Sequence, residues 1–296
     1  MSTRRALTTR QPLAGLRRGA RRWAVLAAAA AAALAGPAQA AITVFEAAAA
    51  TPAGLTPTRD SFRVAVGGGS TAIANGDFGG VRREINWDGV PDPRADPNAL
   101  PANFFNLNSP RGVVFSSPTP GASFAVSASS TSATPTLFGF PGDLQTFSAQ
   151  RLFAAVGSRI TDIHFFLPGT ATPATTSAFA AIFVDVEDNS ASNFTLVEFF
   201  DASNALIFSR HALPGNNQGL SLVGGVASAG ERIGRVRITT PDNFLISNGV
   251  RANERIDFVV MDDFLYATPS LVPEPASWAM ALLGLGALGW KARRQR

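Results

Sequence analysis

Short β-rich segments alternate with turn residues along most of the chain, and this alternation constrains its fold more than any other feature. The segments are rich in Val, Ile, Phe and Thr, which suit a pleated sheet, and Gly, Pro, Asn and Ser separate them. The expected strands are Phe62–Val66, Val81–Trp87, Val113–Ser116, Ser123–Ser127, Ile160–Leu167, Phe179–Val186, Phe194–Phe200, Ala205–Arg210, Gly219–Val226, Ile233–Thr239 and Ile256–Tyr266. With no convincing amphipathic helix between them, they predict an all-β fold, a single β-sandwich.

Two segments show how these strands should pack. Alternate side chains point to opposite faces of a strand, so Phe179–Asp185 should bury at least one face completely. Phe194–Phe200 leads through Asp201–Asn204 into Ala205–Arg210, which predicts a hairpin closed by a four-residue turn.

The first 40 residues have the layout of an export signal. Seven arginines precede the alanine-rich apolar run Trp23–Leu34, and Ala38-Gln39-Ala40 is an A-x-A cleavage site. Arg21-Arg22 before an apolar run is a feature of twin-arginine export signals, but the residues around this pair do not otherwise resemble such a signal. We therefore expect a signal helix over residues 1–40, the Sec translocon and signal peptidase as partners, and a mature chain that starts at Ala41.

The charge balance changes when the export signal, residues 1–40, and the C-terminal segment, residues 272–296, are left out. The whole chain has a net charge of +4, but the body from Ala41 to Leu271 holds 14 arginines against 20 carboxylates. A nucleic-acid-binding protein needs a basic face on its folded part, so no nucleic-acid partner is expected. Cysteine is absent, which excludes disulfides and thiolate sites. The body must therefore be stable through its core alone, and we expect an irregular lead over residues 41–60 and one sandwich domain over 61–270.

The C-terminus has three parts in a fixed order. Pro273-Glu274-Pro275 cannot be helix interior or central strand, because proline lacks an N–H and its predecessor is held extended. An uncharged run, Ala276–Trp290, follows, and a basic cluster from Lys291 to Arg296 ends the chain. This order predicts a transmembrane helix over 276–290 with its basic end on the cytoplasmic side. The run has 15 residues where a bilayer usually needs about 20, a mismatch that snorkelling or local thinning can absorb. The alternative, an apolar helix docked on the core, leaves the proline block and the basic end unexplained.

Val272–Arg296 resembles the PEP-CTERM sorting tail of exopolysaccharide-producing Gram-negative bacteria, a tail also labelled an ice-binding-protein C-terminal domain. The resemblance implies that a membrane-embedded exosortase recognises Pro273, Glu274 and Pro275, cuts the tail off and releases the body to the envelope surface. It implies a short stay in the inner membrane, followed by the cell surface or the extracellular matrix. Ice binding lacks the support of any regular Thr-x-Thr array.

The last expected strand, Ile256–Tyr266, resembles the closing strand of jelly-roll β-sandwich modules. Many such modules bind carbohydrate and use one aspartate of an Asp-Asp pair for a structural calcium ion. By resemblance, the candidates here are Asp262 and Asp263. They point to opposite faces of a regular strand, so at most one should be buried.

A second carboxylate group, Asp185, Glu187 and Asp188, follows an expected strand and offers the oxygen ligands that a hard cation requires. The segment is not an EF-hand loop, because its glycine is missing and Leu196 stands where the bidentate glutamate belongs. Solvated turn carboxylates are the alternative to a calcium site.

The residues expected of common catalytic sites are missing. Neither His164 nor His211 lies in a recognisable nucleophile motif, and no G-x-S-x-G or H-E-x-x-H sequence occurs. We expect His164 to be a hydrogen-bonded core or sheet-face residue. The sequence thus favours a non-enzymatic structural or glycan-interacting envelope protein. A hydrolase of matrix polysaccharide is the alternative, because glycoside hydrolysis needs only two carboxylates, whose spacing along the chain is uninformative.

Overall fold

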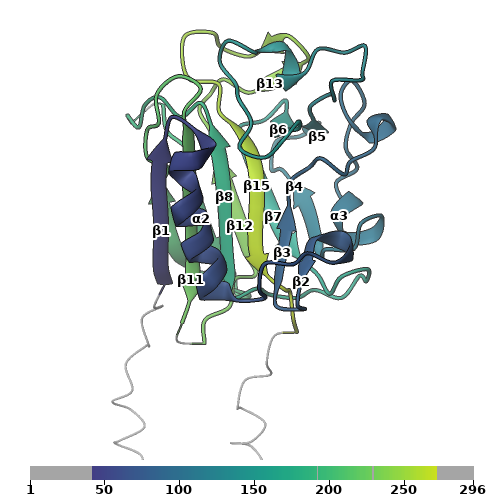
Figure 1. The fold of residues 1–296 in the computed structure, drawn as a ribbon, viewed down its shortest axis with the longest axis vertical. Helices are drawn as coiled ribbons and strands as arrows, with labels where there is room; N and C mark the ends of the chain where they lie inside the picture. Colours follow the sequence, from purple (N-terminus) through teal and green to yellow (C-terminus); the bar gives the residue numbers. More distant parts are fainter. Residues whose placement is uncertain (1–41, 192, 229, 272–296) are drawn as a thin grey trace, which may run out of the picture. The chain divides into compact units, whose positions relative to one another are not determined.

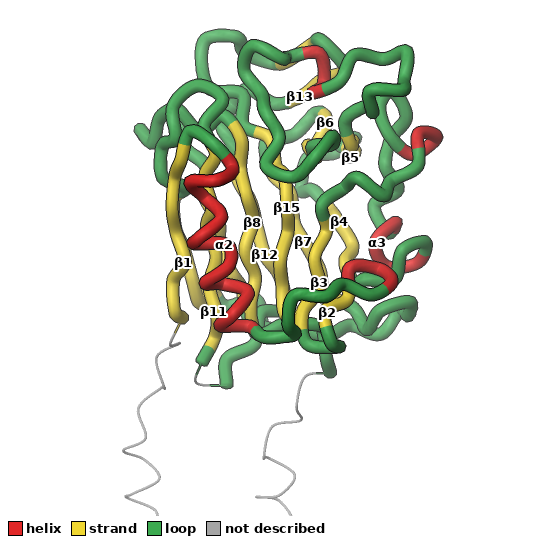
Figure 2. Tube along the Cα trace, in the orientation of Figure 1, coloured by secondary structure: helices red, strands yellow, loops and turns green. Residues whose placement is uncertain are grey.

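The structure, a computed structural model, describes residues 42–191, 193–228 and 230–271. They form a ten-stranded and a five-stranded sheet packed face to face, with one long helix on the outside of the larger sheet (Figures 1 and 2). The β-sandwich predicted from the sequence is therefore confirmed.

Eight strands give the sandwich its topology. The larger sheet has the order β6-β15-β8-β11 at its centre, and the smaller sheet has the order β7-β12-β9-β10. Consecutive strands alternate between the sheets except at the β9–β10 hairpin, and the pairings are antiparallel, as in a jelly roll. The strands are β6 (Phe153–Val156), β7 (Ile160–Phe165), β8 (Ala178–Val184), β9 (Leu196–Phe200), β10 (Leu206–His211), β11 (Leu220–Ala227), β12 (Arg235–Thr239) and β15 (Val260–Ala267).

Further strands extend the edges. In the larger sheet β1 pairs with β11, β3 with β15, and β5 and β13 with β6, while β4 pairs with β7 in the smaller sheet. These elements are β1 (Ile42–Ala49), β2 (Asp77–Phe78), β3 (Arg82–Ile85), β4 (Val113–Ser116), β5 (Ser123–Val126), β13 (Leu245–Ser247), β14 (Val250–Arg251) and the short helix α3 (Phe104–Leu107).

The core between the sheets is dominated by aromatic rings. Trp87 is completely buried and stacks on Phe153, with 4.3 Å between ring centroids. Phe115 packs against Phe153 from the opposite sheet, and Phe179 against Phe199. Every residue of β8 is buried, because its second face packs under helix α2 and the loops on the outside of the larger sheet. The expectation of at least one fully buried face for this strand is confirmed.

Helix α2 (Pro52–Val66) was not predicted. It lies across the larger sheet over β1 and β11 and buries Leu55 and Phe62, two residues seven positions apart on one helix face (Figure 1). Two expectations are therefore wrong: residues 41–60 are not irregular, since they contain β1 and the first half of α2, and Phe62–Val66 is helix instead of strand. Burial on the sheet stabilises the helix despite its internal Pro57.

Strand directions place both ends of the described chain at one end of the sandwich. β1 is antiparallel to β11, β11 to β8, and β8 to β15, so Ile42 and Ala267 lie at the same end (Figure 1). We call this end, from which residues after Leu271 continue, the tail end, and the opposite end, where β8 finishes at Val184, the distal end. The C-terminus of α2 also lies at the tail end, because Arg82, the strand partner of Ala267, donates a hydrogen bond to the carbonyl of Gly67.

Candidate functional site

The outer face of the five-stranded sheet carries an ordered row of polar side chains. Strand alternation sends Val197, Ile163 and Val236 into the core, so their neighbours point outward. The strand register places one such neighbour from each strand side by side, and together they define what we call the open face. In strand order, these five residues are Ser209, Glu198, Arg237, Asp162 and Ser116.

An ion-pair network holds the centre of the open face. Arg237 donates two hydrogen bonds to Asp162, at 2.8 and 2.7 Å, and Arg235 donates a third at 2.7 Å. Burial opposes ionisation of Asp162, but the hydrogen bonds from Arg237 and Arg235 outweigh it and lower the pKa of its carboxyl. Asp162 is therefore a carboxylate at neutral pH and holds both guanidinium groups in place.

His164 lies beside this network, and its Nε2 is 2.9 Å from the hydroxyl of Ser116. Burial lowers its pKa; the attraction of Asp162 opposes this, and the charges of Arg235 and Arg237 add to it. The ring is therefore neutral at pH 7 and has one donor and one acceptor nitrogen. The expectation that His164 is a hydrogen-bonded sheet-face residue is confirmed.

A pocket of about 350 Å³, which we call the Arg235 pocket, lies where the open face meets the tail end. Phe166 and Pro173 contribute apolar walls, and Arg235 and Asn204 contribute polar groups. The Arg235 guanidinium lies 3.8 Å from the centroid of the Phe200 ring, and its Nη2 donates to Oδ1 of Asn204 at 2.6 Å. A concave apolar wall with a few fixed polar groups suits a small polar ring.

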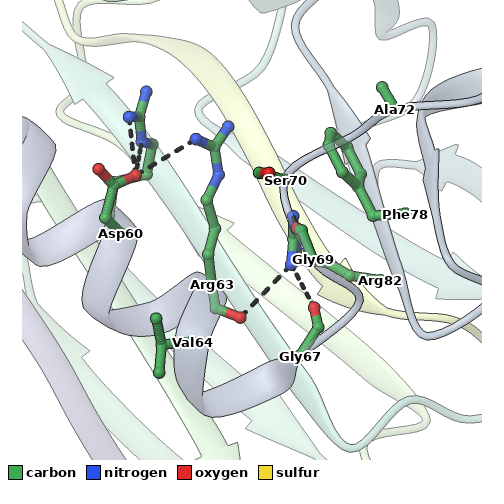
Figure 3. A pocket seen from close by; sticks show the side chains of 10 residues that line it. Asp60, Arg63, Val64, Gly67, Gly69, Ser70, Ala72, Phe78 and Arg82 are labelled. Atoms are coloured by element: carbon green, nitrogen blue, oxygen red, sulfur yellow. Dashed lines mark hydrogen bonds and ion pairs between the residues drawn. The ribbon is translucent and has the colours of Figure 1, made fainter.

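A larger pocket of about 720 Å³ lies beside the C-terminus of α2, and we call it the α2 pocket. Figure 3 shows Arg63 on the helix side of it and Phe78 and Ala72 on the other side, with the Arg82 guanidinium 4.3 Å from the centroid of the Phe78 ring. Arg82 is buried and caps the helix by donating to the carbonyls of Gly67 and Gly69. Arg63 donates to Asp60 at 3.3 Å and pairs with Glu84 through two hydrogen bonds, at 2.9 and 2.6 Å.

The predicted cation ligands are only partly brought together. Asp185 and Glu187 line an acidic basin of about 280 Å³ at the distal end, together with Asp143 and with Asp257, which the sequence reading did not select. Burial, with nearby carboxylates adding to it, raises the pKa of Asp185 to about 7. Across residues 42–191, 193–228 and 230–271, no group of three or more His, Asp or Glu side chains is placed to hold a metal ion.

The other predicted ligands lie outside the basin lining. Asp188 is exposed and accepts a hydrogen bond from the N–H of Asn189. Asp262 and Asp263 are both buried in β15, where a register shift between Met261 and Phe264 interrupts strand alternation. The expectation that at most one of this pair is buried is therefore wrong.

Sequence reasoning missed the residues of the open face. Asp162-x-His164 and Arg235-x-Arg237 both have the alternating polar pattern of a half-buried strand. This alternation was the feature of the sequence that could have pointed to a polar sheet face. Their pairing across β7 and β12 could not be read from either segment alone.

The predicted targeting residues lie outside the described part of the chain: Ala38 and Ala40, Pro273, Glu274 and Pro275, and the anchor 276–290. None of the described helices is long and apolar enough to cross a membrane.

Comparison with known proteins identifies the tail. The PEP-CTERM protein-sorting motif matches residues 271–296. No curated protein matches the chain. The motif marks an exported protein that is processed by an exosortase and reaches the cell envelope.

Proposed function

We propose that the body of this exported protein binds polysaccharide at the cell surface or in the exopolysaccharide matrix, without cleaving it, and that the open face is the binding surface. The observation that carries the proposal is the row of prearranged donors and acceptors from Ser209 to Ser116 across all five strands. Polysaccharides are long and rich in hydroxyl groups, so a flat surface with fixed hydrogen-bonding groups suits them.

The charge balance of the open face favours a sugar over a strongly charged ligand. Asp162 and Glu198 offset Arg235 and Arg237, and His164 is neutral. Arg237 donates two N–H groups and Arg235 one to Asp162, which fixes the planes of both guanidinium groups before a ligand arrives. Binding then costs little side-chain entropy.

The Arg235 pocket would take one sugar ring at the end of the chain. Its apolar walls can pack against the ring, while Asn204 and Arg235 contact hydroxyl groups. Asp201, which also lines this pocket, accepts hydrogen bonds from the N–H groups of Ser203 and Ala205 at 2.8 and 2.9 Å. Asp162 is likewise held by two arginines. Because Asp201 and Asp162 already accept these hydrogen bonds, we favour binding over the hydrolase alternative, which needs carboxylates that are free to transfer protons.

The route to the envelope follows from both ends of the chain. The signal peptide would be removed after Ala40, and the tail would hold the protein in the inner membrane until the exosortase cuts near Pro273-Glu274-Pro275. The released body would then reach the polysaccharide that it binds.

Affinity electrophoresis in exopolysaccharide from the source bacterium tests the proposal, using protein recovered from the envelope. Arg237→Ala should weaken retention about tenfold, equivalent to about 1.4 kcal/mol. Arg210→Ala is the matched control, because Arg210 is an exposed arginine of β10 that pairs with Glu46 on β1. Equal retention of the two variants would reject the open face as the binding surface. Release of reducing ends by the wild type would instead favour the hydrolase.

A further inference from the structure

The α2 pocket runs along the second half of helix α2 to the tail end and combines apolar groups with three arginines and Asp60. Val64, Ala72, Phe78 and Arg63 line it (Figure 3), together with Arg59. This composition suits an amphiphilic anion better than a sugar, because the apolar lining needs an apolar partner and the arginines need a negative one.

Large apolar side chains also stand exposed around this pocket. Val64 is 82% exposed and Ile73, next to Ala72 of the lining, is 62% exposed. Val81 and Leu271 are exposed at the same end of the sandwich. A single exposed apolar residue needs no explanation, but exposed apolar residues gathered around a pocket indicate a contact surface.

The local charge is opposite to that of the body. The lining of the α2 pocket holds three arginines, Arg59, Arg63 and Arg82, against one carboxylate, Asp60, and Glu84 outside the lining pairs with Arg63 and Arg82. The body as a whole has 14 arginines against 20 carboxylates. The acidic basin lies at the distal end. A negatively charged surface would therefore repel the distal end more than the tail end.

The short segment between Leu271 and the uncharged run limits how far the tail end can lie from the membrane. Only four residues, Val272–Pro275, separate Leu271 from the first residue of the uncharged run at Ala276. A fully extended chain covers this interval in at most about 18 Å. While the tail is in the membrane, the tail end must therefore lie against or very near the bilayer surface.

We propose that the α2 pocket and its rim dock on the membrane, with the phosphate of an anionic phospholipid at Arg59 and Arg63 and with Val64 and Ile73 in the headgroup region. Docking would be measurable for the released body at high vesicle concentration and stronger for the tethered one, because the tail raises the local concentration of the bilayer surface. It would turn the distal end away from the membrane and keep the body at the bilayer surface until the exosortase has acted.

This inference rests on the membrane-anchored tail of the proposed function and is independent of glycan binding. The test is co-sedimentation of the processed protein from the envelope with phosphatidylcholine vesicles, with and without phosphatidylglycerol. Binding should require phosphatidylglycerol. Arg59→Gln should weaken it about fivefold, the effect of one basic residue near an anionic surface. Val64→Asp should also weaken it.

Ile246→Asp is the matched control, because Ile246 is an exposed apolar residue of β13 at the distal end and is 49% exposed. Vesicle binding that is undetectable, or that Ile246→Asp weakens as much as Val64→Asp does, would overturn the proposal. Competition by millimolar inorganic phosphate, with no effect of Val64→Asp, would identify a site for soluble anions and would also overturn it. The assay contains no polysaccharide, so its failure is distinct from a failure of glycan binding.

Discussion

The hydroxyl oxygen of Ser148 lies 2.6 Å from Oδ1 of Asp263. The same hydroxyl lies 3.0 Å from Oδ1 of Asp262, whose other oxygen accepts the N–H of Phe147 at 2.6 Å. A hydroxyl has one proton and cannot donate to both carboxylates. Burial raises the pKa of Asp262 well above its ordinary value, and the charge of Asp263 adds to this. Burial raises the pKa of Asp263 as well, so Asp262 is the carboxyl of the pair that takes up a proton first as pH falls; once protonated it can donate to Ser148, which donates to Asp263.

Asp262→Asn should stabilise the protein at pH 8 but have little effect at pH 4. The amide keeps both hydrogen bonds of the neutral acid. The folded pKa of Asp262 is raised, so its contribution to stability is present below the unfolded pKa of about 3.9 and is lost as pH rises toward the folded value. The loss is about 1.4 kcal/mol per pH unit across that interval. Urea unfolding of both proteins at the two pH values measures it.

Ser148→Ala is the companion variant. It leaves both buried carboxyls without their shared partner and should cost about 1–3 kcal/mol at either pH. Ser61→Ala, at an exposed hydroxyl of α2, should change stability by less than about 0.5 kcal/mol. If Asp262→Asn gives the same stability difference at pH 4 and pH 8, Asp262 is not held neutral by the fold.

Arg82→Met should destabilise the protein by about 3 kcal/mol or more, because it removes a buried cation that pairs with Glu84 and caps the carbonyl end of α2. Arg94→Ala, at an exposed position, should cost less than about 0.5 kcal/mol. Circular dichroism during urea unfolding measures both. A loss for Arg82→Met no larger than that for Arg94→Ala would contradict the assigned role of Arg82.

The strands were predictable because their apolar residues alternate and turn residues bound them. Val113–Ser116, for example, has the same bounds in the sequence prediction and in the structure. Helix α2 was not predictable by the same means. Gly54 and Pro57 disfavour helix locally, and packing on β1 and β11 compensates.

Burial of both Asp262 and Asp263 was missed for a different reason. Strict alternation holds only where the pairing register is regular, and the shift between Met261 and Phe264 depends on contacts with β8. The open face was missed because Asp162, Arg235 and Arg237 meet only through pairing of distant strands.

Calcium binding at the acidic basin stays a prediction from the sequence. Burial raises the pKa of Glu187, and a hydrogen bond and repulsion between its carboxyl and that of Asp257 add to this, so a divalent cation would relieve the repulsion. Calcium should then raise the melting temperature relative to chelator, because it binds only the folded state. Calorimetry of the wild type and Asp257→Asn provides the comparison. An identical melting temperature of the wild type with calcium and with chelator would remove the calcium hypothesis.

The most direct measurement of the central claim, export followed by removal of both ends, is the intact mass of the protein recovered from its native envelope. We expect a chain that begins at Ala41 and ends close to Pro273-Glu274-Pro275, without the run 276–290. A mass that includes the terminus at Arg296 would contradict it.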